Sequence, residues 1–71
     1  IHLAALSNVR ESLQTPLSYY RNNVVGSLTL LETLQKQGIA YSVLSSTCAI
    51  YGLPKQTSID EDHAKNPINI Y

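Results

Sequence analysis

The sequence predicts an α/β fold, namely one βαβ unit of a parallel sheet that is incomplete as a domain. Two short apolar runs, at positions 1–5 and 39–44, flank a long amphipathic segment that has its own start and stop signals. The order of strand, crossover helix and strand is the repeating unit of parallel sheets. The chain has 71 residues and begins with Ile1 rather than Met, whereas a typical domain has about 100–150 residues. We therefore expect a piece of a larger domain.

The first expected strand covers positions 1–5. This run is apolar, contains small alanines and no turn residue, and carries His2 within it. A run this short cannot be distinguished from helix by periodicity alone. In such a setting we expect His2 to be a hydrogen-bonded core histidine rather than a ligand. Positions 8–13 are compatible with one or two helical turns.

A long helix is predicted to begin at Pro16 and to end at Gln37. Thr15 supplies an N-cap hydroxyl, proline is favoured at the first helical position, and Gly38 supplies the stop. Apolar residues recur at spacings of three and four, as in an amphipathic helix. This stripe comprises Leu17, Tyr20, Val24, Leu28, Leu31 and Leu34. Gly26 in the interior costs about 1 kcal/mol relative to Ala, which predicts a close neighbouring helix there.

The second expected strand covers positions 39–44, where Tyr41 and Val43 favour extended structure. It leads into the hydroxyl cluster Ser45-Ser46-Thr47, and positions 55–67 are polar and loop-like. Asn66-Pro67 is predicted to open a second helix that includes Tyr71. Ligands of parallel α/β sheets bind outside the carboxyl ends of the strands, so we expect the ligand site near residues 4–7 and 45–48.

The composition argues against several classes of protein. Five Lys and Arg residues balance five Asp and Glu residues, so the chain lacks the basic surface of proteins that bind nucleic acid or anionic membranes. One cysteine and two distant histidines give neither a disulfide framework nor a zinc pattern. No apolar run matches a membrane span, and no signal peptide opens the chain. We expect a cytoplasmic protein without a metal, a nucleic-acid partner or a membrane partner.

Four sequence motifs, taken in order, carry a family resemblance. The first is His2-Leu3-Ala4-Ala5; the second runs from Val9-x-Glu11-Ser12 into Pro16-Leu17-x-Tyr19-Tyr20-x-Asn22-Asn23-Val24-x-Gly26. The third is Ser45-Ser46-Thr47-Cys48-Ala49-Ile50-Tyr51-Gly52, and the fourth is Asn66-Pro67-Ile68-Asn69-Ile70-Tyr71. With these motifs in this order and spacing, nearly the whole chain resembles the extended short-chain dehydrogenase/reductase family, and more narrowly its UDP-glucose 4-epimerase group.

The resemblance implies an enzyme, an NAD-dependent nucleotide-sugar 4-epimerase that acts on a UDP-hexose. The expected reaction interconverts UDP-glucose and UDP-galactose by oxidation at C4 to a 4-keto intermediate and re-reduction. Residues 1–71 would be a fragment of its NAD-binding domain, a Rossmann-type doubly wound parallel sheet, and would not form a complete domain. In the family the long helix also helps to form a dimer interface, so we expect a homodimer through the helix at residues 16–37.

The resemblance also assigns roles to residues. Tyr71 would be the general base that takes the proton from the sugar 4-hydroxyl, and Thr47 would be the hydroxyl residue that bridges Tyr71 and the sugar oxygen. Both would contact the substrate. The cofactor site would be lined by Leu3, Ala4, Ala5, Leu6, Ser7, Asn22, Ser45 and Tyr71.

The proposed base needs help from a cation. A phenol with a pKa of about 10 is a poor base at neutral pH unless a nearby positive charge stabilises the phenolate. In the family a lysine four residues after the tyrosine, one turn along the same helix face, supplies that charge. The chain ends before this position and contains no Gly-rich turn for the pyrophosphate. We expect the 71-residue chain alone to be inactive.

Two alternatives remain open. The chain could come from another extended short-chain dehydrogenase/reductase that acts on a nucleotide sugar, such as a UDP-pentose epimerase or a dehydratase. The related 4,6-dehydratases carry an Asp-Glu pair after the threonine, whereas this chain has Cys48 and Ala49, which favours epimerisation. The chain departs from the family at Ser7, Arg10 and Ile70. The other alternative is a non-catalytic remnant or a helical interaction segment.

Overall fold

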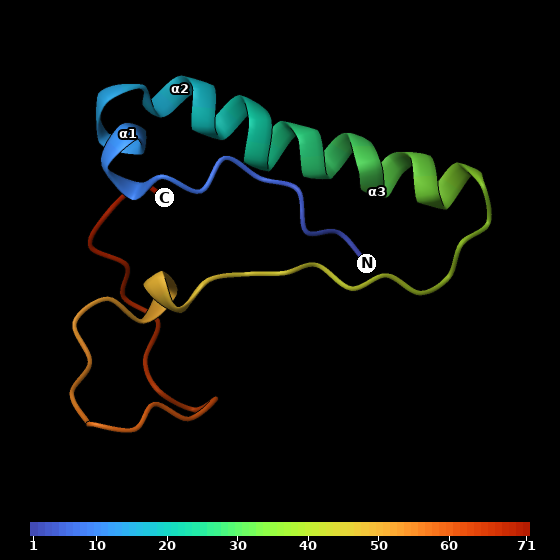
Figure 1. Ribbon diagram of the computed structural model, residues 1–71. Coiled ribbons are helices and arrows are strands. Elements are labelled where there is room, and N and C mark those ends of the chain that lie inside the picture. Colours follow the sequence, from blue (N-terminus) through green and yellow to red (C-terminus); the bar gives the residue numbers. More distant parts are fainter.

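The computed structural model describes residues 1–71 as one long helix that lies along two extended segments (Figure 1). The helical elements are α1 (Val9–Gln14), α2 (Pro16–Tyr19), the π-helical η1 (Tyr20–Val25), α3 (Gly26–Lys36) and the 3₁₀ turn η2 (Cys48–Tyr51). Because α2, η1 and α3 follow one another without a gap, the long helix runs from Pro16 to Lys36. The sequence-based prediction of this helix is therefore confirmed to within one residue.

The end of the long helix follows the predicted glycine stop. Gly38 has φ 71°, its N–H donates to the Gln35 carbonyl at 3.1 Å, and the Ile39 N–H donates to the Leu34 carbonyl at 3.0 Å. These two bonds form a Schellman motif, which needs a residue that tolerates positive φ at this position. The chain then turns back to run beneath the helix (Figure 1).

The predicted N-cap is wrong. The Thr15 side chain makes no capping hydrogen bond to α2; its hydroxyl donates instead to the Glu11 carbonyl at 3.2 Å. The Thr15 N–H donates to the same carbonyl at 2.9 Å, so Thr15 closes α1. The N-cap that does form is at Asn8, whose side chain accepts from the Glu11 N–H at 3.1 Å.

The neighbouring helix expected at Gly26 is also absent. A Cβ built on Gly26 would approach only the Arg21 carbonyl oxygen, at 3.9 Å, which is ordinary van der Waals contact. Gly26 instead marks the point where η1 returns to α-helix, and its N–H donates to Arg21. Asn and Val residues, which make up most of η1, are weak helix formers, so the wider π turn falls where local propensity is lowest.

The two predicted strands are formed only as a single parallel bridge between His2 and Leu44. The His2 N–H donates to the Val43 carbonyl at 2.8 Å, and the Ser45 N–H donates to the His2 carbonyl at 3.1 Å. The segments run in the same direction with the helix as crossover (Figure 1), so the structure shows the order and direction of the predicted βαβ unit but only one bridge of its ladder. A two-stranded ladder without further strands is only marginally stable.

The helix predicted from Asn66-Pro67 does not form, since residues 66–71 are irregular. The Asn66 carbonyl and the Ile68 side chain instead lie against Gly52, at the end of η2. Tyr71 therefore lies in irregular backbone rather than in a helix.

The leucine stripe predicted as the core lies almost entirely exposed. Only Tyr19 and Ser12 are buried. Of the stripe, Leu34 alone is half-buried, and the others range from 46% exposed at Leu31 to 77% at Leu17. The face that meets the extended segments is a different one, on which Tyr19, Asn23, Ser27, Leu30 and Leu34 are buried or half-buried.

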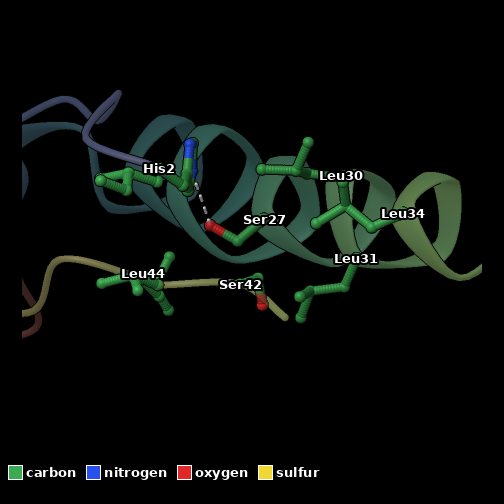
Figure 2. Close-up of a pocket in the computed structure, with 9 residues that line it drawn as sticks. His2, Ser27, Leu30, Leu31, Leu34, Ser42 and Leu44 are labelled. Carbon is green, nitrogen blue, oxygen red and sulfur yellow. Dashed lines mark hydrogen bonds between the residues drawn. The ribbon is translucent and has the colours of Figure 1, made fainter. Parts of the chain in front are cut away.

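The contact between α3 and the extended segments is loosely packed. A cavity of about 150 Å³ lies between them. Figure 2 shows the residues that line it, mainly leucines from α3 together with Ser42 and Leu44 from the second segment. His2 is half-buried at its end, with Nε2 3.4 Å from the Ser27 hydroxyl. The hydrogen bond expected for His2 is therefore present, but the histidine is not in a closed core. None of the helices combines the length and apolar character needed to cross a bilayer.

Candidate active site

A cleft of about 520 Å³ lies at the carboxyl ends of the two extended segments. Residues from four parts of the sequence line it: the first segment, the long helix, the end of the second segment, and Tyr71. The sequence-predicted residues on its wall are Leu3, Ala4, Ala5, Ser7, Ser45, Thr47 and Tyr71. Asn23, Val24 and Ser27 close the side formed by the long helix.

Two of the predicted cofactor residues, Leu6 and Asn22, do not line the cleft. The Leu6 backbone is occupied by Asn23: its N–H donates to Asn23 Oδ1 at 2.9 Å, and its carbonyl accepts from Asn23 Nδ2 at 2.8 Å. Asn22 Nδ2 donates to Asn23 Oδ1 at 2.9 Å. Asn22 therefore supports Asn23, and Asn23 is the asparagine that faces the cleft.

Sequence reasoning missed Asn23, although a signal was present. Asparagine is unfavourable in a helix interior because its amide competes for backbone groups. Two adjacent asparagines in the middle of a long helix therefore indicate that at least one has a partner elsewhere. Here that partner is the Leu6 backbone, and the reciprocal pair of bonds ties the first extended segment to η1.

Thr47 lies at the point where the second extended segment ends and η2 begins. It is the N-cap of η2, and its hydroxyl oxygen accepts from the Ala49 N–H at 3.1 Å. A hydroxyl has one donor hydrogen in addition to its two acceptor positions. The Thr47 hydrogen is therefore free to donate into the cleft while the oxygen is held by the backbone.

Tyr71 reaches the cleft because the loop before it folds back onto the end of η2. Gly52 has φ 66°, and a Cβ built on it would lie 2.0 Å from the Asn66 carbonyl oxygen. His63 holds the same loop: its ring is edge-on to Tyr51 with centroids 5.5 Å apart, and Nε2 accepts from the Lys55 N–H at 3.2 Å. Only glycine permits this close approach, so Gly52 helps to place residues 66–71.

The half-buried Tyr71 ring rests against the long helix. It is edge-to-face with Tyr19, with centroids 6.3 Å apart and planes at 76°. The Tyr19 hydroxyl donates to Glu11 Oε2 at 3.0 Å. Burial raises the pKa of Tyr19 above its ordinary value of 10.0, and the hydrogen bond and negative charge of Glu11 raise it further.

Comparison with known proteins shows the family to which the chain belongs. All of residues 1–71 match the family model described as GDP-mannose 4,6 dehydratase. The chain is 54% identical over 71 residues to the UDP-glucose 4-epimerase of Rhizobium leguminosarum bv. trifolii. This match covers 100% of the chain and 22% of the relative. It is 48% identical to the UDP-glucose 4-epimerase of Lactobacillus helveticus over 71 residues, again 100% of the chain and 22% of the relative.

A plant relative shows the same extent of match. The chain is 42% identical over 71 residues to UDP-glucose 4-epimerase 2 of Arabidopsis thaliana, covering 100% of the chain and 20% of that protein. The chain thus spans about a fifth of the length of the curated relatives that it matches. The chain belongs to the extended short-chain dehydrogenase/reductase family with its Rossmann-like fold, in the branch that the GDP-mannose 4,6 dehydratase model describes.

Proposed function

We propose that this chain supplies the catalytic tyrosine and part of the cofactor wall of an NAD-dependent nucleotide-sugar 4-epimerase. UDP-glucose and UDP-galactose are the proposed substrate pair. The observation that carries the proposal is the cleft that gathers the first extended segment, Thr47 and Tyr71 from distant parts of the chain. Relatives named UDP-glucose 4-epimerase, which match over the whole chain, support the same assignment.

The residues on the cleft wall fit the nicotinamide end of NAD. Its volume of about 520 Å³ is within the usual range of small-molecule sites, about 300–1,000 Å³. Ala4 and Ala5 leave room beside the backbone, and the Ser7, Ser45 and Thr47 hydroxyls supply hydrogen-bonding groups. NAD held by these residues would supply the acceptor and donor of the C4 hydride.

Tyr71 and Thr47 carry the proton chemistry in this proposal. The Tyr71 phenolate takes the proton of the sugar 4-hydroxyl as the hydride leaves C4, which gives a 4-keto sugar. Thr47, whose oxygen is held by the Ala49 N–H, donates its free hydrogen to the sugar oxygen or to the phenolate. Return of hydride to the other face and of the proton to oxygen gives the C4 epimer, so the overall reaction is redox-neutral.

The family description names a dehydratase, but two side chains favour epimerisation. Cys48 and Ala49 occupy the positions after Thr47 where sugar-nucleotide dehydratases carry Asp and Glu. Ala49 cannot transfer a proton, and Cys48 is an exposed thiol at the start of η2. Elimination of water needs a carboxyl acid and base, which these two residues do not supply.

The finer architecture is part of the proposal. We propose that residues 1–71 belong to the NAD-binding domain and that the two extended segments are strands of its doubly wound sheet. We further propose that the long helix contributes to a homodimer interface. The exposed apolar residues Leu17 and Leu28, which are 77% and 55% exposed, would be covered there.

A segment swap tests the catalytic role. In the epimerase of Rhizobium leguminosarum bv. trifolii, the 71 matching residues are replaced by this chain; we call the product the chimera. The chimera should convert UDP-galactose to UDP-glucose, and Tyr71→Phe should lower kcat by about 10²- to 10⁴-fold. Tyr41→Phe, at a residue that is 92% exposed, is the matched control and should change little. A fully active Tyr71→Phe chimera would overturn the proposal.

The coding sequence beyond Tyr71 separates the enzyme from a non-catalytic remnant. A lysine four residues after Tyr71 would lie one helical turn away and supply the cation that a phenolate needs. Any other residue at that position would favour the remnant. The choice between UDP-hexose and UDP-pentose is tested on the product of the complete gene, with both sugars offered separately.

A further inference from the structure

The most buried aromatic residue of the chain lies directly behind the proposed base. Tyr19 is 3% exposed, and its ring meets Tyr71 edge-to-face at a centroid distance of 6.3 Å. The one other buried residue, Ser12, belongs to α1, the helix that also carries Glu11. The tightest packing in the molecule is therefore where α1 and the start of the long helix meet, next to Tyr71.

We propose that Tyr19 and Glu11 are positioning residues that fix the Tyr71 ring for proton transfer. This inference rests on the proposed role of Tyr71 as the base. Proton transfer requires the phenol oxygen within about 2.6–3.2 Å of the substrate hydroxyl. The Tyr71 ring is half-buried, and its one aromatic contact within the chain is with Tyr19. The edge-to-face contact with this buried ring restricts the positions that the Tyr71 ring can take.

Tyr19 is held at both ends of its side chain. Its backbone belongs to α2, its ring is buried, and its hydroxyl donates to Glu11 Oε2 at 3.0 Å. Glu11 is itself fixed: its N–H donates to the Asn8 side chain at 3.1 Å, and its carbonyl accepts from the Thr15 hydroxyl at 3.2 Å. A continuous series of contacts thus runs from the α1 backbone through Glu11 and Tyr19 to Tyr71.

The adjacent Tyr20 provides an internal comparison. It is 48% exposed and carries no aromatic contact within the chain. The two neighbouring tyrosines therefore differ in their contacts: Tyr19 contacts Tyr71 and Glu11, whereas Tyr20 is exposed. The hydroxyl of Tyr19 is held by Glu11, and the Tyr19 ring lies edge-to-face with the Tyr71 ring.

The test uses substitutions in the chimera. Tyr19→Leu removes the ring and should lower kcat by about 10- to 100-fold, since a small misplacement of a reacting group has this effect, while KM stays within about twofold. Tyr19→Phe keeps the ring but, like Glu11→Ala, loses the hydrogen bond between the two residues, so its kcat should lie between those of the unsubstituted chimera and Tyr19→Leu, close to that of Glu11→Ala. Glu11→Ala frees the Tyr19 hydroxyl and should lower kcat by an intermediate amount. Tyr41→Leu, at a 92% exposed site, is the control and should leave both constants unchanged.

Each outcome decides between positioning and simple packing. If Tyr19→Leu and Glu11→Ala both keep full kcat, the inference is wrong. It is also wrong if kcat falls only in step with the melting temperature and Tyr19→Phe gives no rescue. If Tyr19→Leu does not fold, Glu11→Ala alone decides, since Glu11 is exposed. A Tyr71→Phe chimera that stays active would refute the proposed function itself. If the Tyr71→Phe chimera is inactive and the Tyr19→Leu chimera is fully active, only the positioning role is refuted.

Discussion

Thr47 divides the capacity of its hydroxyl between the backbone and the cleft. The oxygen accepts from the Ala49 N–H, which satisfies one of the free amides at the start of η2 and fixes the side-chain orientation. The hydrogen remains available on a wall of the cleft that Tyr71 shares. A residue that caps a helical turn can therefore also take part in chemistry, and the two roles can be separated by substitution.

Two substitutions at Thr47 separate the roles. Thr47→Ser keeps the hydroxyl and should retain kcat in the chimera within a few-fold. Thr47→Val removes a hydrogen bond to a charged group, worth about 1.5–3 kcal/mol, and should lower kcat by about 10- to 150-fold. Loss of the cap itself should cost about 1 kcal/mol of folding free energy, which thermal unfolding measures separately. A Thr47→Val chimera with unchanged kcat would leave Thr47 with the capping role alone.

The raised pKa of Tyr19 predicts how the folding free energy changes at alkaline pH. Burial, the Glu11 hydrogen bond and the Glu11 charge raise the pKa of Tyr19 above 10.0, while the Asn8 backbone acts in the opposite direction. A folded pKa above the unfolded one means that the folded state holds the phenol proton more tightly. The resulting stability is complete below the unfolded pKa, about 10, and is lost as pH rises through the raised folded value.

We therefore expect the chimera to lose folding free energy more steeply than its Tyr19→Phe variant above about pH 10. Urea unfolding over a series of alkaline pH values measures the difference, and because both proteins share every other titrating group, the comparison isolates Tyr19. Parallel curves for the two proteins would show that Tyr19 is not buried against Glu11 as described.

At the scale of elements, two glycines with similar φ angles are required for different reasons. Gly38 has φ 71° and nothing within 4 Å of a built Cβ, whereas Gly52 has φ 66° and the Asn66 carbonyl oxygen at 2.0 Å. Gly38→Ala should cost only the left-handed strain, about 1–2 kcal/mol. Gly52→Ala should cost about 3 kcal/mol or more, since the Asn66 backbone must move.

Tyr71 lies five residues after Asn66, so a shift of the Asn66 backbone should also move Tyr71. Gly52→Ala should therefore reduce kcat in the chimera, and Gly38→Ala should not. Urea unfolding gives the first difference and steady-state kinetics the second. Equal effects of the two substitutions on both measurements would mean that the contact between Gly52 and Asn66 does not place Tyr71.

Asn23 ties the first extended segment to the long helix. Asn23→Ala removes two hydrogen bonds to the Leu6 backbone and should cost about 1–2 kcal/mol, because water can reach these exposed groups and replaces part of the loss. It should also reduce the NAD retained by the purified chimera. Asn22→Ala removes one bond to Asn23 and should destabilise less. If Asn22→Ala is the more destabilising of the two, the tie has been assigned to the wrong asparagine.

The elements differ in how far local sequence determines them. The long helix was predictable because proline, apolar spacing and Gly38 act within the segment itself. The strands were predictable in position and direction but not as regular ladders, since a ladder depends on what pairs with its outer edges. The apolar stripe misidentified the buried face for a related reason. Tyr19 is buried because α1 and Tyr71 cover it, and the periodicity of the helix carries no information about those neighbours.

The residues of the candidate site also differ in how far local sequence identifies them. Thr47 and Tyr71 could be named from motifs, and Ala4, Ala5 and Ser7 from the position of ligands at strand ends. The pair of adjacent asparagines gave a signal for Asn23 but not its partner, Leu6, and the pairing of Tyr19 with Glu11 had no signal, because these contacts join residues 17 and 8 positions apart. Such contacts depend on the path of the chain between elements, which propensity and periodicity do not specify.

The molecule as a whole exposes far more surface than a folded domain of its mass. Its accessible surface is 6056 Å², whereas a compact 7.8 kDa protein exposes about 4,400 Å². Its radius of gyration is 14.3 Å, and it extends over 42 × 30 × 15 Å; about 11 Å is expected for a compact chain of this length. The excess includes large apolar side chains, among them Leu17, Tyr41 and Leu53 at 77%, 92% and 75% exposure.

This surface predicts the behaviour of the chain in isolation. Burial of apolar area is the main term that offsets chain entropy, and only two residues of the chain are buried. We expect the 71-residue chain, studied alone at micromolar concentration, to show a broad, non-cooperative change in far-UV circular dichroism on heating, with a helical signal that weakens gradually. The chimera, in which the same residues meet the rest of the relative, should unfold in a sharp transition. A sharp, concentration-independent transition of the isolated chain would mean that one helix on two extended segments holds together without a conventional core.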